Sequence, residues 1–248
     1  KSVMFQKFVA LILGFLLFLF FYRDVSPLSV VGLRMIWFTL GVTVVNAYFI
    51  RREIKKFLDL SLLLFPVLFI WSAIAVVFLL PGGALKLLGI LITILLFIKI
   101  EANPTARYLG PFEEKVFFIT AFGLFLGVWT LDYYFNFSWW LVILLFFGIC
   151  FALLWSAFYQ LGTTLYRKLL YCHFAALLLA QSSWALLFWS LHYFTMSVVF
   201  MGFFYLAWII FRLQLEANIN GKKVFFHVML VTVLEATALT FARWLPPR

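Results

Sequence analysis

Long, unbroken apolar runs separated by short polar loops dominate this sequence. The stretches from Phe8 to Tyr22 and from Trp139 to Ala157 contain no charged residue. In the hydrocarbon core of a bilayer, only helices and closed barrels satisfy every backbone N–H and C=O group. A strand of a membrane barrel alternates apolar and polar side chains, whereas these runs are continuous. The runs therefore predict an all-α fold, a polytopic transmembrane helical bundle.

Composition and charge support a membrane location. Of 248 residues, 67% are hydrophobic and 11% are charged, against about 45–50% and 25% in soluble domains. A water-soluble fold of this size could not bury so much apolar surface, so we expect membrane lipids to be the main partner. The net charge is +10, but the basic residues lie between apolar runs and form no contiguous face, so we expect no nucleic-acid partner.

The spacing of the apolar runs predicts about nine membrane spans, because each span needs about 20 mostly apolar residues. We expect helices over residues 4–22, 28–50, 57–80, 84–100, 113–134, 138–160, 168–192, 195–215 and 222–244. The loops between them are too short to fold alone. We therefore expect a single transmembrane domain over residues 1–248.

The distribution of lysine and arginine predicts the orientation of the chain. On one side of the predicted bundle lie only Arg23, Arg34, Lys86, Arg243 and Arg248, and the rest of the 19 basic residues lie on the other. Loops rich in lysine and arginine stay in the cytoplasm. We therefore place the N-terminus in the cytoplasm and the C-terminus outside, in a bacterial or archaeal inner or cell membrane.

Short matches indicate an internal repeat. Ile100-Glu101-Ala102-Asn103 recurs as Leu215-Glu216-Ala217-Asn218, and Lys115-Val116-Phe117-Phe118 recurs as Lys223-Val224-Phe225-Phe226. We expect two four-helix repeats, residues 1–111 and 112–220, followed by one extra helix within 221–248. Because four is an even number, the copies would be parallel and related by an axis along the membrane normal, as in some transporters.

Glu235 is the sharpest candidate for a functional residue. It follows Lys223 by about 18 Å along the predicted helix axis, at 1.5 Å per residue, which places it near the bilayer midplane. An ionisable group at that depth is costly and by default suggests function. Two interpretations stay open: a carboxylate that binds a proton or cation, with Thr232 adding polarity nearby, or a structural acid that holds the last helix to the bundle.

A polar patch lies within the predicted seventh helix. Gln181, Ser182 and Ser183 follow one another in an otherwise apolar stretch. Such side chains line a cavity or hydrogen-bond between helices, and the second interpretation is the one that we favour.

Paired polar residues also mark the inner ends of the fourth and eighth helices. Glu101 with Asn103, and Glu216 with Asn218, occupy matching places in the two repeats and could form a pseudo-symmetric site. In the simpler interpretation, which we favour, asparagine ends a helix and each glutamate pairs with a nearby lysine or arginine.

Histidine and cysteine offer only a weak case for a metal or haem. His227 and His173 are expected at a similar depth near the cytoplasmic face, where Cys172 or Glu216 could join them. No close ligand spacing supports such a site. We therefore assign no metal, no cofactor and no catalytic residue.

Three functions remain open from the sequence. The first is a carrier or transporter of a small or lipophilic molecule, with Glu235 as the coupling group. The alternative is a non-catalytic scaffold or subunit of a larger membrane complex, which would add other membrane subunits as partners. The least favoured is a membrane enzyme that acts on lipid-linked substrates, with its site among the inner Glu, Asn and His residues.

Overall fold

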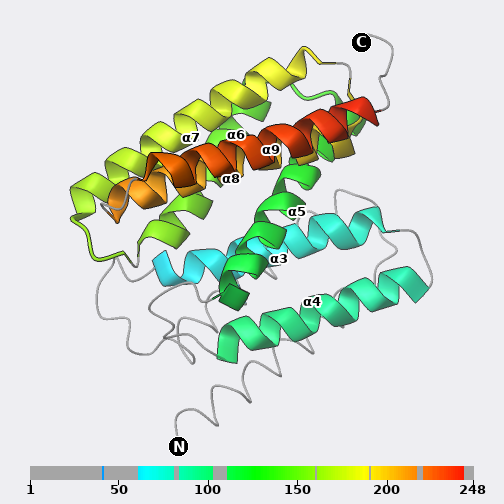
Figure 1. Ribbon diagram of the computed structural model, residues 1–248. Helices are drawn as coiled ribbons and strands as arrows, with labels where there is room; N and C mark the ends of the chain where they lie inside the picture. The colour runs from blue at the N-terminus through cyan, green and yellow to red at the C-terminus, as the bar shows by residue number, and fades with distance from the viewer. Residues whose placement is uncertain are drawn as a thin grey trace, which may run out of the picture. The chain divides into compact units, whose positions relative to one another are not determined.

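The computed structural model describes residue 41 and residues 61–80, 84–102, 111–159, 161–189, 191–216 and 220–242, as helices joined by short connections. Seven helices lie in these ranges (Figure 1). They are α3 (Ser61–Leu79), α4 (Ala84–Ala102), α5 (Pro111–Phe135), α6 (Trp139–Phe158), α7 (Leu165–Leu187), α8 (Tyr193–Leu215) and α9 (Gly221–Thr240).

The all-helical prediction is confirmed for the described residues, which contain no strand. Each of the seven helices overlaps one of the predicted spans. The two remaining predicted spans, 4–22 and 28–50, lie outside the described residues apart from residue 41, which is helical. The total of nine helices and the repeat therefore stay predictions.

Five helices, α5 to α9, are long and apolar enough to cross a membrane. A further apolar segment, Leu64–Leu79 in α3, is shorter. Side chains such as Trp139, Phe188 and Phe241 are more than half exposed. Exposed apolar side chains of this size fit a surface that faces lipid rather than water. The five helices indicate a membrane protein, as the composition predicts.

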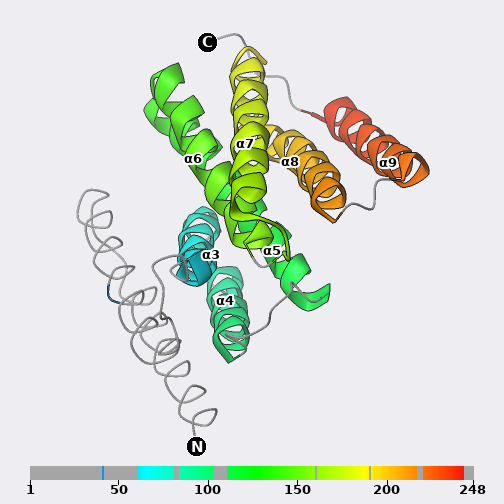
Figure 2. The same ribbon diagram turned by 90° about the vertical axis from the view of Figure 1, so that its left-hand side faces the viewer.

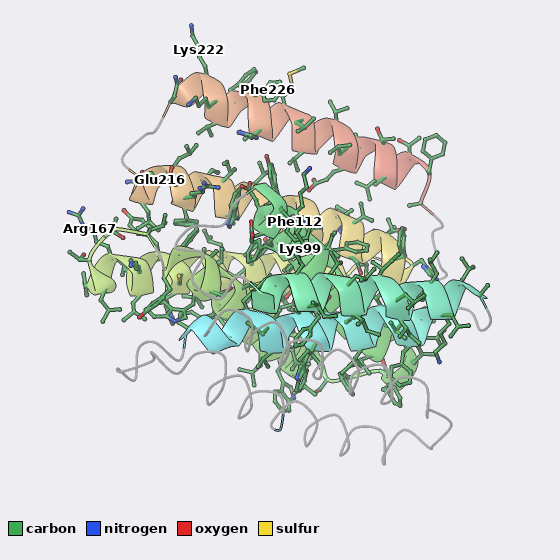
Figure 3. All side chains as sticks on the ribbon, turned by 90° about the horizontal axis from the view of Figure 1, so that it is seen from below. Lys99, Phe112, Arg167, Glu216, Lys222 and Phe226 are labelled. Carbon is green, nitrogen blue, oxygen red and sulfur yellow. The ribbon has the colours of Figure 1, made fainter. Side chains whose placement is uncertain are left out.

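The chain divides into two compact units, Lys1–Thr120 and Ala121–Arg248. In the first unit, the core joins α3, α4 and the beginning of α5. Phe69 stacks on Phe97 with ring centroids 6.3 Å apart, and both are buried. The ammonium group of Lys99 lies 3.4 Å from the centroid of the Phe112 ring (Figure 3), so this lysine near the end of α4 contacts the first turn of α5.

An aromatic cluster forms the core of the second unit. Phe125 of α5 contacts Phe200 and Phe204 of α8, with centroids 4.7 and 5.2 Å apart and rings close to perpendicular. Phe146 of α6 packs 4.4 Å from Phe200. All four side chains are fully buried. Aromatic pairs in such edge-to-face geometry contribute about 0.5–1.5 kcal/mol beyond burial, so these rings fix how α5, α6 and α8 meet.

The last four helices pack one against the next. α6 contacts α7 and α8, α7 contacts α8, and α8 contacts α9. Figure 2 shows these helices in chain order with α9 at the edge. Val231 is the one described residue of α9 that is buried, so most of this helix faces away from the other described helices.

Local hydrogen bonds fix the ends of two of these helices. The side chain of Asn220 accepts a hydrogen bond from the backbone N–H of Lys222 at 3.0 Å, which is an N-cap at the start of α9. Thr164 is the N-cap residue of α7, but its side chain makes no capping hydrogen bond. Instead, the ammonium group of Lys168 reaches back to the carbonyl oxygen of Tyr159 at the end of α6.

Candidate functional site

The carboxyl group of Glu235 lies between α8 and α9. Its Oε1 atom is buried and has no hydrogen-bond partner. On the facing helix is Gly202, where an added Cβ atom would collide with Oε1 of Glu235 and would lie 3.0 Å from Cγ1 of Val231. The missing side chain at Gly202 therefore creates the space that the carboxyl group occupies. We call the contact formed by Gly202, Tyr205, His227, Val231 and Glu235 the α8–α9 seam.

The helical period explains why the acid faces the protein. The less exposed positions of α9 are Val224, His227, Val231, Glu235 and Ala238, with Leu239 beside the last. Their spacing of three or four residues puts them on one side of a helix. The intervening side chains are exposed, and those of Phe225 and Phe226 are more than 60% exposed. Glu235 therefore occupies the one stripe of α9 that contacts the bundle.

The depth of Glu235 differs slightly from the prediction. Because α9 begins at Gly221 and ends at Thr240, the acid lies about 21 Å from the start of the helix and about 8 Å from its end, at 1.5 Å per residue. The helix was expected to continue to residue 244. Glu235 lies inside the apolar segment, but past its middle, toward the C-terminal end.

A side-chain hydrogen bond also joins α8 and α9 in the N-terminal half of α9. The hydroxyl group of Tyr205 and Nδ1 of His227 are 2.8 Å apart, and the rings meet at 64° with centroids 5.7 Å apart. Which of the two donates depends on the histidine tautomer. His227, a candidate metal or substrate ligand from the sequence, therefore joins α9 to α8.

Thr232 makes no hydrogen bond to Oε1 of Glu235. Its hydroxyl donates to the carbonyl oxygen of Val228 at 2.9 Å, one turn earlier in the same helix. Thr237 and Thr240 do the same with Val233 and Ala236. These threonines are exposed on α9, and each satisfies its own hydrogen bond.

The polar patch of α7 lies on a helix that packs against α6 and α8. Ser182 donates to the carbonyl of Leu178 at 3.0 Å, and the buried Ser183 donates to Ala180 at 2.7 Å. Gln181 is exposed. None of these three side chains hydrogen-bonds to Oε1 of Glu235, so the structure does not join the two predicted polar groups.

At the ends of the helices, Glu216 pairs with a basic neighbour. Its Oε1 accepts a hydrogen bond of 2.9 Å from Nε of Arg212, one turn earlier on α8. Figure 3 shows Glu216 at the end of α8 and Lys222 at the start of α9. The side chain of Lys222 points away from the bundle. Asn103 and Asn218 lie outside the described residues, as does the side chain of Glu101. The pseudo-symmetric site therefore stays a prediction.

Cysteine and histidine are dispersed in the described helices. Cys150 and Cys172 are free and buried, and His173 packs its ring against Phe147 with centroids 5.4 Å apart. In the described ranges, no group of three or more His, Cys, Asp or Glu side chains could hold a metal ion.

Sequence reasoning identified Glu235 and missed Gly202. A lone glycine within α8, an otherwise bulky helix, was the available signal, because a glycine at that place permits close approach of another helix. Comparison with protein-family models, with curated proteins and with solved structures gave no match. Since function resides in sites rather than folds, the α8–α9 seam carries the functional argument.

Proposed function

We propose that this chain is a carrier of a small or lipophilic molecule, in which Glu235 couples the movement of that molecule to a proton or cation. The observation that supports this proposal is the buried Oε1 atom of Glu235, which lies over Gly202 without a hydrogen-bond partner.

An isolated carboxylate is costly in an apolar medium. An ionised group buried without a partner is destabilised by several kcal/mol or more. In the part of the chain that the structure describes, no ion pair includes Glu235. The group must therefore hold a proton or bind a cation when it faces the hydrocarbon. That requirement is what a coupling residue needs, because its charge then depends on what is bound.

The place of α9 in the bundle also supports a carrier. Its main contact is with α8, and most of its surface is exposed. A helix that packs on one neighbour can shift at a lower cost than a helix in the middle of a bundle. Movement of α9 along α8 would open the seam toward the lipid, where a lipophilic molecule is dissolved.

We propose the nine-helix, repeated architecture together with the carrier function. The spacing of the helix starts supports the repeat. In the first series, α3, α4 and α5 begin at Ser61, Ala84 and Pro111. In the second series, α7, α8 and α9 begin at Leu165, Tyr193 and Gly221. The intervals between successive starts are similar in the two series. A cytoplasmic N-terminus, an outer C-terminus and a bacterial or archaeal membrane belong to the same proposal.

A scaffold or subunit of a membrane complex is the second candidate. It is favoured by the hydroxyls of Ser182, Ser183 and Thr232, which bond within their own helices and leave less polarity for a ligand. The two candidates differ in one respect that can be measured. In a scaffold, the charge of Glu235 would have no effect on flux across the membrane.

The experiment uses purified protein in liposomes that contain a pH-sensitive dye. After a pH step, lipophilic amines, lipophilic acids and amino acids are added one at a time, and proton entry is recorded. After the flux in protein-free liposomes is subtracted, we expect at least one class to accelerate proton entry in the wild type. Glu235→Gln should reduce that flux ten-fold or more, whereas Glu216→Gln, at the exposed end of α8, should preserve it. Equal flux in the wild type and Glu235→Gln would contradict the coupling role.

A further inference from the structure

A stripe of exposed side chains runs along α7. Its members recur at the alternating four- and three-residue intervals of a heptad seam. They are Leu170, Phe174, Leu177, Gln181, Trp184 and Phe188, the last of which directly follows the helix. The five apolar members are between 39% and 72% exposed. We call this set the α7 stripe. Such spacing suits a helix that packs on a second helix at a shallow angle, and Leu178 and Ala185 beside the stripe are exposed as well.

Gln181 is the polar member of the α7 stripe. It lies about 9 Å before the end of α7, at 1.5 Å per residue, inside an apolar segment long enough to cross the membrane. Its neighbours Ser182 and Ser183 satisfy their hydroxyls on their own helix. Among the described residues, Gln181 has no hydrogen bond of its side chain. An amide left unpaired in hydrocarbon costs several kcal/mol, so this side chain needs a partner that lipid tails do not provide.

We propose that the α7 stripe binds the α7 stripe of a second copy of this chain, with Gln181 opposite Gln181. Copies inserted in one membrane share an orientation, so a two-fold axis along the membrane normal makes the two α7 helices parallel and brings each residue near its own equivalent. A glutamine amide carries both donors and an acceptor, and two of them therefore satisfy each other. A single polar residue in a heptad seam also fixes its register.

The proposal goes beyond the carrier function and does not depend on it, because it uses neither Glu235 nor the α8–α9 seam. A second copy is the expected partner because the amide is self-complementary at Gln181, the polar member of the stripe. Lipid alone, or another helix of the same chain, would leave two separate copies without a contact between their α7 stripes.

The first test is disulfide cross-linking in liposomes that contain only this protein. Leu177→Cys and Trp184→Cys place a thiol one turn before and one turn after Gln181. Leu144→Cys is the matched control. Leu144 is 58% exposed and lies in the first half of α6, the helix that packs against α7. The wild type serves as background, since its own Cys150 and Cys172 are buried.

With copper phenanthroline as oxidant, we expect most of the Leu177→Cys and Trp184→Cys protein to become a covalent dimer. The Leu144→Cys variant should give less than about one tenth of that yield, because a disulfide needs Cα atoms about 4.4–6.8 Å apart. Yields at Leu177 and Trp184 no higher than at Leu144 would overturn the proposal.

The second test measures dimer formation by subunit photobleaching at a series of protein-to-lipid ratios. Gln181→Leu should weaken the dimer about ten-fold, which is within the range for a side-chain hydrogen bond between membrane helices. Gln181→Asn, which retains an amide, should weaken it less. Because leucine suits the bilayer, Gln181→Leu should insert normally, which its tryptophan emission spectrum reports. A Gln181→Leu protein that inserts normally and dimerises as strongly as the wild type would contradict the amide pairing.

Discussion

The ammonium group of Lys168 donates a hydrogen bond of 2.6 Å to the backbone carbonyl oxygen of Tyr159. Lys168 lies in the first turn of α7 and is only 8% exposed, and Tyr159 is the C-cap residue of α6. A cation at the C-terminal end of a helix satisfies a carbonyl group that has no partner within the helix and interacts favourably with the helix dipole. This side chain thus links the end of α6 to the start of α7.

Replacing Lys168 should therefore weaken the contact between α6 and α7. We expect Lys168→Met to lower the free energy of unfolding by about 1.5–3 kcal/mol, the usual contribution of a hydrogen bond from a charged donor. Arg167→Met is the matched control, because Arg167 is the adjacent cation and is exposed. The measurement is unfolding by dodecyl sulfate in mixed micelles. Equal losses in the two variants would assign the effect to net charge instead.

A methyl group at position 202 should disturb the α8–α9 seam. We expect Gly202→Ala to destabilise the protein by about 1–3 kcal/mol, because the new Cβ atom overlaps the carboxyl group of Glu235 and presses on Val231. Gly148→Ala on α6 should be neutral or stabilising, since nothing lies within 4 Å of its Cβ position and alanine favours helix formation.

The source of that destabilisation can be separated by a double-mutant cycle in the same unfolding assay. If the clash is with Glu235, the Gly202→Ala change should cost less in a Glu235→Ala background, by about 0.5–3 kcal/mol of coupling. Additive effects would place the strain elsewhere, at Val231 or within α8.

Loss of the hydroxyl group of Tyr205 should loosen α9 at its N-terminal half. Tyr205→Phe removes the 2.8 Å hydrogen bond to His227. We expect a loss of about 0.6 kcal/mol and at most about 1.7 kcal/mol, the average and the maximum for side-chain hydrogen bonds between membrane helices. Hydrogen exchange of the α9 amides should rise accordingly. Tyr166→Phe on α7 is the control, because Tyr166 is 74% exposed, and it should leave this exchange unchanged.

The N-cap of α9 should control its access to protease. Asn220→Ala removes the hydrogen bond to the N–H group of Lys222, which typically costs about 1 kcal/mol. A change of that size makes the frayed state about five-fold more populated, so trypsin should cut at Lys222 or Lys223 about five-fold faster. Thr164→Ala should not accelerate cleavage at Arg167, because Thr164 makes no capping hydrogen bond. Similar acceleration at both sites would contradict the role of the cap.

The bounds of a helix were predictable where charged or turn residues flank the apolar run. They were less predictable where the flanking residues are apolar too. α6 was expected over 138–160 and spans Trp139–Phe158. α7 was expected to continue to residue 192, but it ends at Leu187, with Phe188 as C-cap. The residues that follow are as apolar as the helix itself. In a membrane protein a loop can be apolar too, so hydropathy does not show where such a helix ends.

The candidate site was predictable only in part. Glu235 is conspicuous in the sequence because a carboxyl group in an apolar run has a cost that demands a reason. The position of its carboxyl group over Gly202 depends on how α9 packs against α8. No local sequence pattern predicts such a contact between two separate apolar runs. The hydroxyl of Thr232 donates to its own helix, because a carbonyl one turn away is always within reach, and its expected contribution beside the carboxyl group stays a prediction.

Many hydroxyl groups in the apolar helices bond to a carbonyl oxygen three or four residues earlier in the same helix. Those so bonded include Thr120, Thr130, Ser156, Ser182, Ser183, Ser197, Thr232, Thr237 and Thr240. A span whose polar groups are satisfied internally needs no neighbour when it leaves the insertion machinery. The order in which such spans enter the bilayer can then simply follow synthesis. The side chain of Gln181 has no such bond within α7, so newly made α7 is a span that gains from early association with a neighbour.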